Sequence, residues 1–180
     1  NRCNYSENTF RNNGAGVAVM YTKNVEMLEN RFEYNWGSAA YGLLLKEITD
    51  SIIKHNTFLK NSTGLYAESS NRIQITENIF EQNGWAVKIM GNCLDNNFFK
   101  NNFLANTFDV ATNVKHNFNL FKDNYWDSYD GYDLDRDGVG DLPYRPVSLF
   151  SYLVEQNKPS LLLIRSLFVD MINIAESIMP

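Results

Sequence analysis

The feature that most constrains this chain is a short motif, Asn-x-Phe or Asn-x-Trp, which recurs six times in one register. Its asparagines are Asn8, Asn30, Asn56, Asn78, Asn101 and Asn124, separated by 22, 26, 22, 23 and 23 residues. A period of this length is typical of a repeat architecture, in which one unit cannot bury its apolar face without its neighbours. The motif therefore limits the fold to a solenoid and measures how far apart residues of different repeats lie.

Short alternating apolar patterns keep the same register. A second asparagine follows each of the first five anchors by five residues, as Asn83 follows Asn78, and alternating pairs such as Ile73/Ile75 and Val87/Ile89 lie on either side. The second repeat fits after an insertion of four residues around Ser38–Tyr41. Several very short strands per repeat, separated by Asn and Gly, predict an all-β, right-handed parallel β-helix.

Equivalent residues of such a solenoid stack roughly 4.8 Å apart along the coils. The recurrent asparagines can then bond to one another as amide ladders, and the recurrent phenylalanines can fill the corner of each coil. We therefore interpret both repeats as structural rather than as a binding site.

Three regions follow from the pattern: β-helix coils over residues 1–126, an acidic loop that caps them over 127–146, and a helical segment over 147–180. Asn1 already lies inside a coil, so we expect the chain to be the C-terminal part of a longer solenoid. Ser148 is predicted to cap a helix at Leu149–Gln156, and a second helix is expected from about Leu161 to Ile178. Its apolar stripe is expected to pack on the chain and comprises Leu161, Ile164, Phe168, Met171, Ile172, Ala175 and Ile178.

Charge and cysteine positions exclude several classes of function. The formal net charge of −5 and scattered basic residues argue against nucleic-acid binding, and Arg165 and Asp170 interrupt the most apolar segment, so no membrane-spanning run is predicted. Cys3 and Cys93 belong to coils about four apart, roughly 19 Å, which is too far for a disulfide. We expect Cys3 to be a small core residue.

The acidic loop contains a pattern typical of calcium binding. Aspartates at alternate positions precede a glycine turn, and the expected ligands are Asp133, Asp135, Asp137, the carbonyl of Val139 and Asp141. Tyr144 replaces the bidentate glutamate of an EF-hand and no helices flank the loop, so Asp130 or another oxygen would have to complete the shell. The predicted role of Ca²⁺ is structural, holding the loop over the last coil. The alternative is a solvated acidic turn.

One stretch also resembles a known family. The run from Asn124 to Glu155, NYWDSYDGYDLDRDGVGDLPYRPVSLFSYLVE, and the following LLLIRSLFV at residues 161–169 are similar to the C-terminal part of NosD proteins. The coils upstream resemble the broader class of carbohydrate-binding and sugar-hydrolase β-helices. The resemblance implies a periplasmic accessory factor that assists copper-site assembly of nitrous oxide reductase. It also implies copper as cofactor, with an ABC transporter permease/ATPase complex and the apo-reductase as partners.

The register assembles no copper ligands. Met20 and Met90 share an expected outward position but lie three coils, roughly 14 Å, apart, as do His55 and His116, and Met27 aligns with the core. Met171 and Met179 are roughly 12 Å apart on the expected helix. The copper ligands therefore remain unassigned.

Two other function classes stay open. A polysaccharide lyase, hydrolase or epimerase would need paired acids on one outward face, whereas Glu33, Glu47, Glu68 and Glu81 are expected at different register positions. We assign no catalytic residue. A carbohydrate-binding or protein-binding solenoid would use Trp36, Tyr41, Tyr66 and Trp85, which lie close to the same turn of their coils, as a contact strip.

Overall fold

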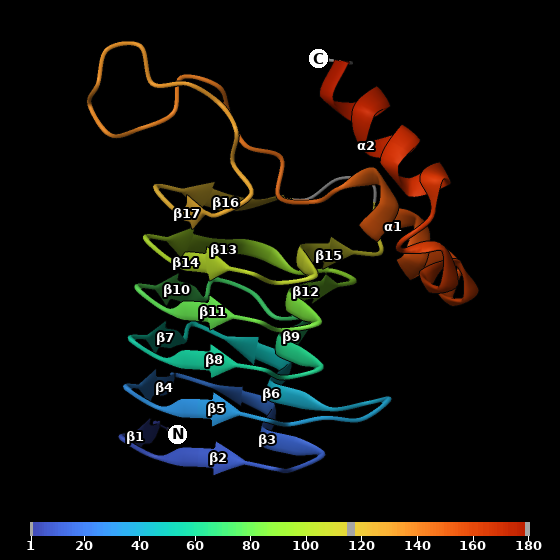
Figure 1. Ribbon diagram of the computed structural model, residues 1–180. Coiled ribbons are helices and arrows are strands. Elements are labelled where there is room, and N and C mark those ends of the chain that lie inside the picture. The colour runs from blue at the N-terminus through green and yellow to red at the C-terminus, as the bar shows by residue number, and fades with distance from the viewer. Residues whose placement is uncertain (1, 115–117, 179–180) are drawn as a thin grey trace.

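The computed structural model describes residues 2–114 and 118–178, and within them three parallel sheets wind into a right-handed β-helix (Figure 1). The first sheet contains β1 (Cys3–Ser6), β4 (Val25–Leu28), β7 (Ile52–Lys54), β10 (Gln74–Thr76), β13 (Leu94–Phe99) and β16 (Phe118–Lys122). The second contains β2 (Thr9–Arg11), β5 (Arg31–Glu33), β8 (Thr57–Leu59), β11 (Ile79–Glu81), β14 (Asn102–Leu104) and β17 (Tyr125–Trp126). The third contains β3 (Ala15–Lys23), β6 (Tyr41–Thr49), β9 (Thr63–Glu68), β12 (Trp85–Met90) and β15 (Phe108–Thr112). The predicted fold is confirmed.

The predicted amide ladders run along two corners of the coils, the first from Asn8 to Asn124 and the second from Asn13 to Asn106. In the first ladder, each asparagine donates from Nδ2 to Oδ1 of the next, over 3.0 Å from Asn30 to Asn56 and from Asn56 to Asn78. The same Oδ1 atoms accept the main-chain N–H of the preceding ladder asparagine, so a polar corner is satisfied without water. The second ladder repeats this arrangement, with 2.8 Å between Asn35 Nδ2 and Asn61 Oδ1.

Each corner also depends on a left-handed residue that the repeat pattern did not reveal. The residue before a ladder asparagine has positive φ, as at Glu29 (56°), Glu77 (55°) and Lys60 (51°). This conformation is uncommon outside glycine. The ladder bonds hold it in place, since they fix the main-chain N–H of the residue that follows.

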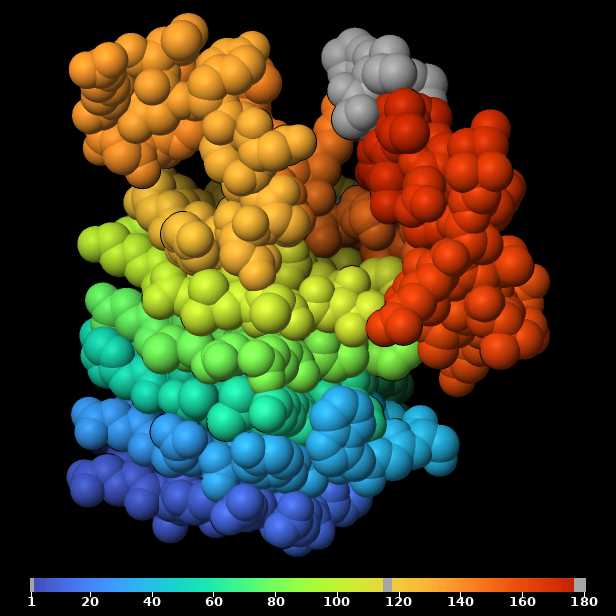
Figure 2. All heavy atoms as spheres, viewed as in Figure 1, coloured from blue at the N-terminus to red at the C-terminus, as the bar shows by residue number. Residues whose placement is uncertain are grey.

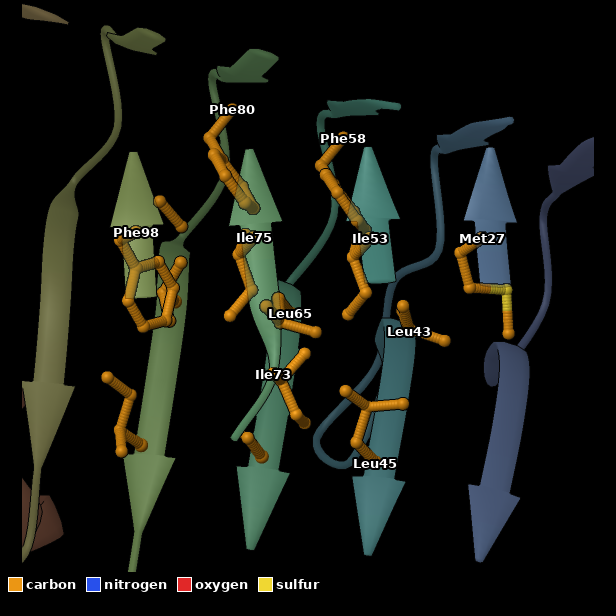
Figure 3. Packing of buried hydrophobic residues seen from close by; sticks show 14 of the residues in the cluster. Met27, Leu43, Leu45, Ile53, Phe58, Leu65, Ile73, Ile75, Phe80 and Phe98 are labelled. Atoms are coloured by element: carbon orange, nitrogen blue, oxygen red, sulfur yellow. The ribbon is translucent and has the colours of Figure 1, made fainter. Parts of the chain in front are cut away.

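Stacked rings and aliphatic side chains fill the solenoid (Figure 3). Neighbouring anchor phenylalanines stack with ring centroids 4.7 Å apart between Phe58 and Phe80 and 5.0 Å apart between Phe80 and Phe103. Trp126 continues the stack at 4.1 Å from Phe103. The third sheet approaches these rings closely at Gly64, where a Cβ would lie 3.3 Å from Phe80 Cδ1 and 2.6 Å from the carbonyl oxygen of Ala86. Glycine is therefore required there.

The C-terminal segment folds beside the third sheet (Figures 1 and 2). Helix α1 spans Leu149–Gln156, as predicted, and Ser148 Oγ accepts its capping bond from Ser151 N at 3.1 Å. The second helix was placed too early: a 3₁₀ helix, η1, spans Lys158–Leu163, and α2 spans Leu167–Ile178.

The expected apolar stripe packs inward only in part, since Ile164 contacts the buried cluster and Ile172 is half-buried. Phe168 and Met171 are exposed, whereas Val169 is buried against Phe150 and Val154 of α1. The side chain of Ile178 lies outside the described residues. The helix is apolar on more than one side, so spacing alone did not identify the side that packs inward.

Candidate functional site

Three aspartates of the acidic loop converge. Ligand oxygens of Asp133, Asp135 and Asp137 lie within 4.8 Å of one another, and all three side chains are exposed. The turn places them together through positive φ at Arg136 (61°) and Gly138 (86°). Hard carboxylate oxygens in this arrangement suit a divalent cation such as Ca²⁺.

Backbone donors already hold the first of these carboxylates. Asp133 Oδ2 accepts from Gly138 N at 2.9 Å and its Oδ1 accepts from Asp137 N at 3.2 Å. The bond from Gly138 is the main cause that lowers the pKa of Asp133 below its usual value. Asp133 is therefore ionised at neutral pH and its position is fixed by the loop.

The other expected calcium ligands are placed differently. Asp141 lies outside the group of three, and its Oδ2 accepts from Leu134 N at 2.7 Å. Asp130 is exposed and also lies outside the group. Val139 is exposed and donates its N–H to Asp137 Oδ1 at 2.7 Å.

A polar cluster that the sequence did not single out attaches the loop to the last full coil. Asp109 of β15 accepts from Tyr144 Oη at 3.1 Å and from Ser128 Oγ at 3.3 Å, and the ring of Tyr144 packs 4.8 Å from that of Trp126. Burial raises the pKa of Asp109, and it raises the pKa of Tyr144 to about 12. In the sequence, Asp109 is one residue of an ordinary strand, so no pattern marked it.

The structure divides the predicted aromatic strip into an open and a covered part. Tyr41 and Tyr66 contact each other on the outer face of the third sheet, with ring centroids 4.9 Å apart. Trp36 lies in the inserted loop before Tyr41 and is 57% exposed. Trp85 stacks on Phe108 at 5.5 Å, beneath the C-terminal segment. On coils two and three, Trp36 is thus exposed and Tyr41 and Tyr66 are half-buried.

An ion pair holds the covering segment on the sheet. Lys88 of β12 donates to Glu155 of α1, and its Nζ lies 3.8 Å from the ring centroid of Trp85. Burial lowers the pKa of Lys88, and the bond to Glu155 opposes that shift. The indole N–H of Trp85 is buried with no hydrogen-bond partner within the described part of the chain.

The soft donors are dispersed. Cys3 and Cys93 are both free; Cys3 is half-buried in the first coil, whereas Cys93 is buried and its Sγ accepts from Ser70 N at 3.4 Å. Met27 is in the core, as predicted. Met90 pairs with Glu68 in the outward register position that Met20 also occupies, as predicted, but it is buried. His116 and Met179 lie outside the described residues.

The acidic residues considered for catalysis need one correction. Glu33 and Glu81 occupy the same register position, because each pairs with Leu59 from opposite sides. They therefore lie two coils, roughly 10 Å, apart with a leucine between them. Glu33 is also engaged by Arg31 at 3.2 Å.

Comparison with known families identifies the chain. Residues 1–131 match the family described as "Periplasmic copper-binding protein (NosD)", which is most of the sequence. The chain belongs to the NosD family. The matched residues are the coils and the start of the acidic loop. The resemblance seen in the sequence lies instead in residues 124–155 and 161–169. No curated protein matches this chain. Among the described residues, no helix has the length and apolar character needed to cross a membrane.

NosD proteins are periplasmic and are described as copper-binding, so the donors can be tested against copper. Copper(I) prefers clustered thiolate, thioether and imidazole ligands. Within residues 2–114 and 118–178, the group of three or more potential ligands consists of exposed carboxylates. Burial raises the pKa of Cys93, which keeps it a thiol at neutral pH. Among the described residues, the cysteines and His55 therefore form no cluster that would hold copper(I).

Proposed function

We propose that this chain is a rigid platform that assists copper-site assembly of nitrous oxide reductase together with an ABC transporter. The match to NosD over residues 1–131 carries this proposal. The separation of Cys3 and Cys93 supports a role in bringing partners together, because the described cysteine and histidine residues form no copper(I) cluster of their own. Copper would then be held by residues of a partner or in contact with one.

The experiment is co-purification with the apo-reductase and with the permease/ATPase complex. We expect both to bind, and copper transfer to the reductase to persist when Cys93 is replaced by serine. Turnover of an acidic polysaccharide, with neither protein partner bound, would instead support the enzyme alternative and contradict the proposal.

We further propose that the open part of the aromatic strip contacts one of these partners. Tyr41 and Tyr66 on the third sheet and Trp36 in the adjoining loop provide apolar contact area, and aromatic residues are enriched in protein interfaces. Trp36→Ala combined with Tyr66→Ala should weaken co-purification of one partner at least tenfold. Tyr125→Ala, at a comparably exposed residue on the second sheet, is the control. Retention of oligosaccharides on the strip, with unchanged partner binding, would favour a carbohydrate-binding solenoid.

The acidic loop is proposed to bind Ca²⁺ as a structural ion. Support comes from the convergence of Asp133, Asp135 and Asp137 and from the like-charge repulsion that a cation would relieve. Calorimetric titration should show Ca²⁺ binding, and Asp137→Ala should abolish it. Asp130→Ala tests whether Asp130 is a fourth ligand. A titration without heat for the unmodified chain would reject the site.

A further inference from the structure

The turn between α1 and α2 and the start of α2 carry several exposed apolar side chains. The three leucines at residues 161–163 are 37, 89 and 43% exposed, and Leu167 and Met171 of α2 are 75 and 62% exposed. Phe168 adds an aromatic ring to this surface. Contiguous patches of more than a few hundred Å² are rare on monomeric soluble proteins and mark interaction sites. We refer to residues 158–171 as the apolar corner.

The geometry of η1 favours a fluid partner over a shaped one. Consecutive residues of a 3₁₀ helix point about 120° apart, so the leucines at 161–163 face three directions. A protein groove grips a helix along one stripe with spacings of three and four residues. Hydrocarbon chains can surround side chains that point in all directions.

Two cations flank the leucines. Lys158 begins η1, Arg165 follows it, both are exposed, and neither forms an ion pair with another residue of the described ranges. Long basic side chains can keep their charges among headgroups while neighbouring apolar residues enter the layer below. Nearby acids are partly engaged: Glu155 binds Lys88 and Glu176 accepts from Leu149 N, which leaves Asp170 exposed on α2.

We propose that the apolar corner lies in the interface of an anionic phospholipid bilayer. Leu162, Leu167 and Phe168 enter the boundary between headgroups and acyl chains. Lys158 and Arg165 contact lipid phosphates. The attraction is local, because charges farther than about 8 Å from the surface are screened at physiological salt. A net charge of −5 therefore does not prevent it. This proposal rests on neither copper delivery nor the transporter.

Co-sedimentation of the full chain with lipid vesicles tests the proposal, with a chelator present to remove Ca²⁺. Phosphatidylcholine vesicles with phosphatidylglycerol should bind the chain, and phosphatidylcholine alone should bind it more weakly. Lys158→Gln with Arg165→Gln should remove that difference, since each basic residue contributes about fivefold near an anionic surface.

The leucines are tested by Leu162→Ser combined with Leu167→Ser, which should weaken binding about a hundredfold, or about tenfold per leucine. Both positions are exposed, so circular dichroism should show an unchanged fold. Leu134→Ser is the matched control, because Leu134 is 77% exposed in the acidic loop, and it should change nothing.

Three results would overturn the proposal. The first is the absence of sedimentation with either vesicle, and the second is equal binding by the double leucine variant. The third is binding that requires a protein at the corner. If that protein is a second copy of the chain, light scattering would show a dimer that the double leucine variant lacks. If it is the permease, the chain would bind vesicles that contain the permease and would not bind plain vesicles.

Discussion

Replacing Asn61 with alanine tests the amide ladder in the middle of the coil stack. Asn61 is fully buried, and its Oδ1 accepts from Asn35 N at 3.2 Å and from Asn35 Nδ2 at 2.8 Å. Its Nδ2 donates to Phe32 O at 2.9 Å and to Asn83 Oδ1 at 3.0 Å. One side chain thus serves the coils on both sides of its own.

The magnitude follows from the partners that alanine would leave unpaired. Asn35 Nδ2 keeps its bond to Phe10 O, and Asn83 Oδ1 keeps the bond from Asn61 N. The carbonyl of Phe32 loses one donor but stays within the β5–β8 pairing, so the buried group left unpaired is the N–H of Asn35. An unsatisfied buried group costs about 1–3 kcal/mol, so Asn61→Ala should lower the free energy of unfolding by about 1–3 kcal/mol. This is a large part of the 5–15 kcal/mol, roughly, that stabilises a typical domain.

Urea denaturation followed by tryptophan fluorescence measures this loss. The control is Asn13→Ala, at the exposed end of the same ladder. Within the described ranges, the main-chain N–H of Asn13 donates to Asn35 Oδ1, and its side chain forms no hydrogen bond. We expect the control to change stability by less than about 0.5 kcal/mol. Equal effects of the two substitutions would refute the ladder as a source of stability.

Three further predictions concern other parts of the molecule. Gly64→Ala should destabilise the fold by about 1–3 kcal/mol, because its Cβ meets the carbonyl of Ala86, whereas Gly14→Ala meets open space and should be nearly neutral in the same urea assay. Asp109→Asn should raise the melting temperature at neutral pH and lose this advantage in acid. The folded-state pKa of Asp109 is raised, so its contribution to stability is present at low pH and lost as pH rises through that pKa; thermal scans that show no such dependence would contradict this. Glu155→Gln should leave Lys88 charged and partly buried without its ion-pair partner, and should increase proteolytic cleavage within α1–α2 without unfolding the coils.

The sequence predicted the solenoid and its interior because both depend on a repeated register. Every ladder asparagine and anchor ring recurs at nearly constant spacing, so an irregular coil can be aligned by comparison with the other coils. The left-handed conformation of the corner residues could not be predicted from the sequence, since Glu29, Lys60 and Glu77 share a conformation but no chemical character.

The candidate sites were less predictable because they lie where the repeat ends. A local motif placed Asp133, Asp135 and Asp137 together, but whether Asp141 joins them depends on loop closure. Asp109 and Tyr144 are 35 residues apart and meet only through the tertiary fold. The helix η1 interrupts a segment whose apolar content resembles one continuous helix, since packing rather than propensity decides which apolar side is buried.

The insertion before Tyr41 has a consequence for how such a chain can change. Asn35 and Asn61 are 26 residues apart, yet they form the same ladder bond as Asn61 and Asn83, which are 22 apart. The added residues leave the coil without shifting its register, and Gly37 N donates to Ser62 Oγ at 3.0 Å to fix their exit. Extra sequence at this corner can therefore acquire a new function while the interior stays the same, which makes it a natural position for grafting a binding loop.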